Sequence, residues 1–107
     1  MPHTPARIAI AMGALMAALS ASAQDASAAL HLRATAATCA NCHGTNGRTV
    51  DGSAIPALAG MPRAYMLMQM QAFRDGSRPA TVMHQITKGL TQQQVEQVAD
   101  YFAAVKR

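Results

Sequence analysis

Two cysteines and a histidine stand close together in the run Cys39-Ala40-Asn41-Cys42-His43. Thiols with two residues between them can each add to a vinyl group along one edge of a haem, and the imidazole that follows them can bind the iron. This C-x-x-C-H spacing is the attachment signal of c-type haem. It predicts one covalently bound haem c per chain, with Cys39 and Cys42 as the attachment points and His43 as an axial ligand of the iron.

Two alternative uses of the cysteines stay open. Paired cysteines also serve in thiol redox sites, so a thiol oxidoreductase using Cys39 and Cys42 is an alternative of another class. A structural zinc site needs four ligands, and the chain has two cysteines in all. Because His43 completes the haem pattern and no βαβ context of the thioredoxin kind is found, the sequence favours haem over both alternatives.

The second axial position of the iron needs its own ligand. A thioether there closes the iron to small molecules and raises its reduction potential. Met66, Met68 and Met70 lie in an apolar helical stretch, where methionine is usually packing, and Met61 lies at a turn. The predicted ligand is Met83, forty residues after His43, with the neighbouring imidazole of His84 as its rival.

The N-terminus has the pattern of an export signal. A short basic segment, residues 1–7, precedes an uncharged run of 12 residues, 8–19, which is too short for the roughly 20 residues of a membrane-spanning helix. Ala21-Ser22-Ala23 fits a small-x-small cleavage site. We therefore expect a signal peptide over 1–23, a mature domain over 24–107, a periplasmic location and no stable membrane span after cleavage. An uncleaved membrane anchor is the alternative.

The mature chain predicts an all-α fold, because no run of alternating β-branched residues argues for a sheet. Removing 23 of the 107 residues leaves 84, with no tryptophan, two phenylalanines and two tyrosines. So small a domain has little apolar material for a core, and we expect the haem to complete it.

Capping residues, glycines and prolines divide this domain into elements. The predicted segments are a helix from Asp25 to about Cys39, a loop from Gly44 to Gly60, a helix from Ala64 to Arg74 that follows Pro62 and ends at Asp75-Gly76, and a short helical turn between Pro79 and Gly89. Thr91 and Gln94 then form a capping box for a last helix. Its apolar stripe, which we expect to pack against the first helix, consists of Val95, Val98, Ala99, Phe102 and Val105.

From Cys39 to Tyr101 the chain resembles a class I cytochrome c, through its haem motif, the proline-containing loop 55–60, the methionine segment and the aromatic last helix. More narrowly, the run 73–83, together with Tyr65 and Gln69, is similar to the cytochrome subunit of flavocytochrome c sulfide dehydrogenase. The resemblance implies a small cytochrome c fold of three to four helices around one haem.

The same resemblance implies roles for two residues. Met83 takes the place of the distal iron ligand, and the carbonyl of Pro56 takes the place of the group that accepts a hydrogen bond from the proximal histidine, His43. The chain departs from the two-haem members of that subfamily because it has one C-x-x-C-H motif.

An iron with both axial positions filled has no place for a substrate, so the predicted function is electron transfer, without catalysis by the chain itself. A single-haem periplasmic carrier and the haem subunit of a flavocytochrome sulfide dehydrogenase complex are the two forms of this function. The partners are then redox proteins, which in the second form include a flavoprotein subunit.

Basic residues occur throughout the loop and the predicted ligand segment. They are Arg48, Arg63, Arg74, Arg78 and Lys88. A basic rim around the haem would steer an acidic redox partner, and an ordinary solvated surface is the alternative. Binding to nucleic acid is not expected, because export separates the protein from it.

Overall fold

The computed structural model describes residues 5–107, with side chains from Ile10 onward. It divides into two compact units, one up to His31 and one from Leu32 to Arg107, with the boundary inside helix α1 (Pro5–Ala37). In the first unit the described side chains are all exposed, and the hydroxyls of Ser20 and Ser22 donate to backbone carbonyls four residues earlier. The haem motif and the predicted ligands all belong to the second unit.

Helix α1 begins earlier than the sequence analysis predicted. Asp25 lies within the helix and does not cap its start, so that prediction was wrong. The cause is composition, because the run 8–37 is rich in alanine, has Gly13 as its one glycine and contains no proline. Pro5 suits the first position of a helix, where no intrahelical partner is needed for its missing N–H. The first four residues of the basic segment 1–7 lie outside the described residues.

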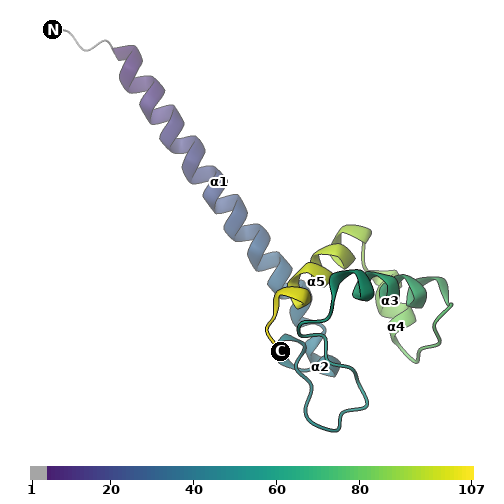
Figure 1. Ribbon diagram of the computed structural model, residues 1–107. Helices are drawn as coiled ribbons and strands as arrows, with labels where there is room; N and C mark the ends of the chain where they lie inside the picture. Colours follow the sequence, from purple (N-terminus) through teal and green to yellow (C-terminus); the bar gives the residue numbers. More distant parts are fainter. Residues whose placement is uncertain (1–4) are drawn as a thin grey trace. The chain divides into compact units, whose positions relative to one another are not determined.

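The second unit is helical, and the described residues contain no strand. After the end of α1 come the single turn α2 (Ala40–His43), the 3-10 turn η1 (Thr45–Gly47), α3 (Arg63–Asp75), α4 (Met83–Gly89) and α5 (Gln92–Ala104). Figure 1 shows the long loop between η1 and α3, and the three helices α3, α4 and α5 grouped together. The predicted all-α class is confirmed. The prediction of three to four helices did not separate α2 from the helix before it.

The predicted bounds of α3 and the predicted start of α5 agree with the structure to within about two residues. Gly76 ends α3 in the left-handed conformation (φ +84°), as expected of a C-terminal glycine. At the start of α5, the Thr91 hydroxyl accepts from Gln94 N (3.1 Å) and the Gln94 side chain accepts from Thr91 N (2.8 Å). The capping box is therefore confirmed.

The core of this unit lies between the end of α1, α3 and α5. Its buried members are Ala36, Met66, Val98, Ala99 and Phe102. The expected packing of the last helix against the first is confirmed by the contact of Ala36 with this cluster. Phe102, which is 1% exposed, is the one aromatic side chain in the buried cluster. Cys39 packs against the same cluster, so the haem motif begins at the edge of the core.

Candidate functional site

One helical turn presents the residues of the haem motif. Cys39 precedes α2, and its carbonyl accepts hydrogen bonds from the backbone N–H groups of Cys42 (3.3 Å) and His43 (2.9 Å). Both thiols are free, with Cys39 half-buried and Cys42 exposed. This turn brings two unbonded thiols and one imidazole together, which is the set that haem attachment needs.

His43 is fixed by a hydrogen bond to the loop. The imidazole is buried, and its Nδ1 lies 2.6 Å from the carbonyl oxygen of Pro56. When Nδ1–H donates to this carbonyl, the tautomer is set and Nε2 is left as a free ligand atom. A partner of this kind also raises the basicity of a ligating imidazole. This is the contact that the resemblance to cytochromes c implied for Pro56.

The position of the Pro56 loop depends on Gly47. The carbonyl of Gly47 accepts from Leu58 N (2.8 Å) and Ala59 N (3.1 Å), two and three residues after Pro56. Further along, Gly60 N donates to the carbonyl of Phe102 (2.8 Å), which ties the loop to α5. The hydrogen-bond acceptor of His43 is thus held by backbone contacts on the loop residues that follow it.

The environment of Cys39 does not suit a reactive thiol. Burial raises the pKa of Cys39, and a hydrogen bond with the Thr38 side chain opposes this effect only in part. Nucleophilic cysteines need the opposite shift, because the thiolate is the reactive form. In the part of the chain that the structure describes, no three His, Cys, Asp or Glu side chains are grouped as a metal ion would require. The raised pKa of Cys39 weighs against the thiol redox alternative.

Met83 lies on another element, as the first residue of α4, and is half-buried. Helix α4 packs on α3. The rival ligand His84 follows Met83, and its Nδ1 is buried with no hydrogen-bond partner. The other methionines of the second unit differ in burial. Met66 is buried in the core, Met61 and Met70 pack against it, and Met68 is exposed.

Apolar side chains next to the predicted haem contacts are open to solvent. Ile55 precedes Pro56, Val82 precedes Met83, and Ile86 follows Met83 by one turn of α4; they are 39%, 48% and 41% exposed. A haem bound between the loop and α4 would remove such side chains from water. Together with the free Nε2 of His43 and the two free thiols, this apolar surface fits a haem.

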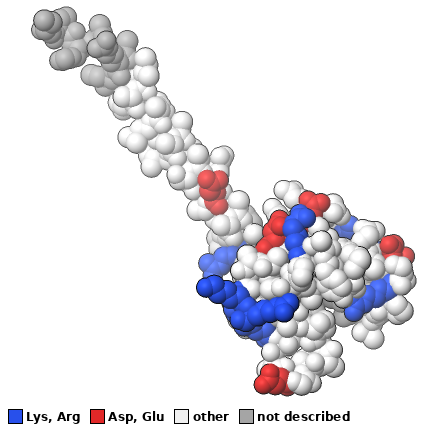
Figure 2. Space-filling model, in the orientation of Figure 1, with Lys and Arg blue, Asp and Glu red and all other residues white. Residues whose placement is uncertain are grey.

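A basic pocket lies beside the loop. It has a volume of about 520 Å³, and its lining includes Arg48, Tyr65 and Arg107. Arg48 also donates to the backbone carbonyl of Lys106 (2.7 Å), which holds the last residues of the chain next to the loop. Figure 2 shows Lys and Arg side chains gathered on the visible face of this unit. The sequence analysis named Arg48 and missed Lys106 and Arg107, whose position at the end of the chain gave no sign of this contact.

An all-α domain that presents two cysteines at haem-attachment spacing and a fixed imidazole on one turn fits a c-type cytochrome. The chain belongs to the cytochrome c family, whose model, described as cytochrome c, matches residues 33–106. As a member of this family it is an electron carrier with covalently bound haem c, one haem for the one motif in this domain.

Three relatives at 36–38% identity show which proteins the chain is similar to. It is 38% identical over 71 residues to a thiosulfate dehydrogenase electron acceptor of Thiomonas intermedia, covering 66% of this chain and 33% of that protein. It is 36% identical over 70 residues to the cytochrome subunit of sulfide dehydrogenase of Chlorobaculum tepidum, covering 65% and 62%. Cytochrome c4 of Pseudomonas aeruginosa is 36% identical over 74 residues, covering 69% and 36%. The chain thus spans between one third and about three fifths of the length of these relatives.

Proposed function

We propose that this chain is a single-haem periplasmic electron carrier whose iron is held by His43 and Met83. The observation that carries the proposal is the 2.6 Å contact from His43 Nδ1 to the carbonyl of Pro56. It prepares Nε2 as a ligand and orients the ring from a loop that has its own backbone support. A buried histidine with this one polar contact is well suited to bind iron permanently.

Each of the other residues has a defined part. Cys39 and Cys42 would hold the haem through thioether bonds, and His43 and Met83 would bind its iron. When bound, the haem supplies a one-electron ferric/ferrous couple. The exposed Ile55, Val82 and Ile86 are the side chains of this chain that would exclude water from the haem faces. With both axial positions filled, the chain carries electrons and converts no substrate itself.

The periplasmic location rests on the predicted signal peptide over residues 1–23. Among the described residues, no helix combines the length and the apolar character needed to cross a membrane. Cleavage near Gln24 would release a mature domain that contains both cysteines and both proposed ligands. N-terminal sequencing of the haem-containing protein from the periplasm tests this point, and an intact Met1 would contradict it.

The proposed electron donor is a dehydrogenase of reduced sulfur compounds. Two relatives are named as an electron acceptor of thiosulfate dehydrogenase and a cytochrome subunit of sulfide dehydrogenase. Arg48 and Arg107, which line the pocket beside the loop, supply positive charge for an acidic partner surface. We expect electron transfer to slow as the salt concentration rises, because screening weakens this attraction.

A second form of the proposal makes the chain the haem subunit of a flavocytochrome sulfide dehydrogenase. The similarity of the run 73–83 to such subunits supports it. Purification at native expression level separates the two forms, since a flavin-containing chain in stoichiometric amount favours the subunit. A monomer that accepts electrons from a separately purified dehydrogenase favours the carrier.

The ligand assignment is tested by replacing methionines one at a time. Met83→Ala should abolish the near-red absorption band of ferric, sulfur-ligated haem and open the ferrous iron to carbon monoxide. Met68→Ala is the matched control, because Met68 is 56% exposed and lies on α3. If the band survives Met83→Ala, another residue is the ligand, and His84→Ala then tests the rival imidazole.

A further inference from the structure

Arg74 joins three parts of the second unit through its guanidinium group. It lies in the last turn of α3 and is half-buried. Nε and Nη2 donate to the carbonyl of Thr87 (3.2 and 2.9 Å), and Nη2 also donates to the carbonyl of Leu90 (2.8 Å). Nη1 donates to the side chain of Gln92 (3.3 Å) on α5. One side chain therefore fixes the end of α4 to both neighbouring helices.

Helix α4 needs such external support. It has seven residues, and helices much shorter than about 12 residues are unstable by themselves in water. The last carbonyls of any helix lack intrahelical partners, and a cation there is favourable. Arg74 supplies both a charge and donors to this end, while the Thr87 side chain is fully buried. Thr87 lies one turn, roughly 6 Å along the axis, from Met83 at the start of the helix.

The segment before α4 is held by a second arginine. The guanidinium of Arg78 lies over the ring of Phe73, 4.6 Å from its centroid, and donates to the side chain of Gln69. The backbone N–H of Arg78 donates to the carbonyl of Ala72 (3.0 Å). Residues of α3 thus hold the chain both before and after Met83.

We propose that Arg74 is a positioning residue for the axial ligand, which acts by holding α4 so that the thioether of Met83 stays on the iron. This inference rests on the proposed role of Met83. Arg74 touches neither the haem motif nor Met83 in the contacts described above, so its effect on the iron passes through α4. The planar guanidinium is essential because this one group must donate hydrogen bonds to two carbonyls and an amide in fixed directions.

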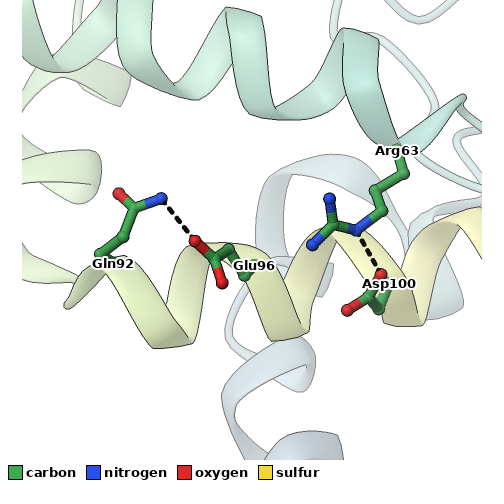
Figure 3. Close-up of polar contacts among 4 residues, drawn as sticks. All are labelled: Arg63, Gln92, Glu96 and Asp100. Carbon is green, nitrogen blue, oxygen red and sulfur yellow. Dashed lines mark hydrogen bonds and ion pairs between the residues drawn. The ribbon is translucent and has the colours of Figure 1, made fainter.

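Another arginine of the same helix provides a matched control. Arg63, in the first turn of α3, forms an ion pair with Asp100 of α5 (2.5 Å), with both side chains about half exposed. Figure 3 shows this pair, and also Gln92 donating to Glu96 (2.9 Å) on the same face of α5. Arg63 therefore links α3 to α5 without contacting α4, whereas Arg74 links both of them to α4.

The experiment compares the haem-containing full chain with the variants Arg74→Gln, Arg74→Lys and Arg63→Gln. The near-red band of the ferric protein is followed during heating, and far-UV circular dichroism reports helix loss in the same samples. We expect Arg74→Gln to lose the band about 5–10 °C earlier than the wild type while the helices remain. Carbon monoxide should bind ferrous Arg74→Gln about tenfold faster, which corresponds to about 1.4 kcal/mol.

Arg74→Lys keeps the charge without the planar guanidinium, and we expect it to lose the band at an intermediate temperature. If Arg74→Gln does not yield haem-containing protein, Arg74→Lys takes its place as the test variant. Arg63→Gln should lose band and helicity together, at nearly the wild-type temperature. The inference is overturned if the Arg74 variants keep the band until the helices melt, or bind carbon monoxide at the wild-type rate. A wild-type protein without the band would instead overturn the ligand role of Met83, and this inference with it.

Discussion

Gly47→Ala is a sharp test of how the proline loop is held beside His43. Gly47 has a φ of +72°, and an added Cβ would lie 2.8 Å from Leu58 Cβ and 2.9 Å from both Ala59 N and Phe102 Cδ1. Two of these neighbours cannot move freely, because Ala59 N is backbone and Phe102 is in the core. Relief of the overlap would strain the hydrogen bonds from Leu58 and Ala59 to the Gly47 carbonyl.

The expected loss of stability has two parts. An alanine in the left-handed region costs about 1–2 kcal/mol. Overpacking against core and backbone atoms adds about 1–3 kcal/mol. The total, about 2–5 kcal/mol, is a large share of the 5–15 kcal/mol by which typical domains are stable. A shift of the loop would also loosen the contact between His43 and Pro56.

Gly52→Ala is the matched control for this change. Gly52 has a similar φ of +78°, yet nothing lies within 4 Å of its added Cβ. Guanidinium unfolding of the haem-containing proteins, followed by circular dichroism, measures both variants. We expect Gly47→Ala to be less stable than Gly52→Ala by about 1–3 kcal/mol. Equal stabilities within about 0.5 kcal/mol would refute the close packing at Gly47.

Two further predictions concern helix ends. Thr91→Ala should destabilise the holoprotein by about 1 kcal/mol, measured by guanidinium unfolding, because it removes the side-chain half of the capping box with Gln94; an unchanged midpoint would contradict the role of the cap. At the end of α3, the side-chain and backbone hydrogen bonds from Ser77 lower the pKa of Asp75. Ser77→Ala should raise that pKa toward its usual range in an NMR titration. Since the folded pKa is the lower one, the contribution of Asp75 to stability is present above the unfolded pKa and is lost as pH falls through the folded value.

Local signals in the sequence predicted much of the fold. The ends of α3 and α5 followed from Gly76 and from the Thr91 capping box, because both act within a few residues. The start of α1 was predicted wrongly, since an aspartate in an alanine-rich run can cap a helix or lie within one. The helix propensity of the whole run 8–37 decided between these cases. The presence of one aspartate could not decide between them.

The sequence also predicted some parts of the candidate site and missed others. The C-x-x-C-H spacing identified Cys39, Cys42 and His43, because one turn of helix brings them together. The contact with Pro56 came from the family resemblance, since Pro56 lies thirteen positions after His43. The bridge from Arg74 was missed. A basic residue in a last helical turn was visible in the sequence, but its carbonyl partners lie on another element and depend on the packing of α4 against α3.

The central claim is a closed iron held by His43 and Met83, and the visible spectrum of the purified, haem-containing chain tests it most directly. We predict a near-red band in the ferric protein and only slow binding of carbon monoxide by the ferrous protein. A ferric spectrum without the band, together with rapid carbon monoxide binding by the ferrous form, would contradict the claim.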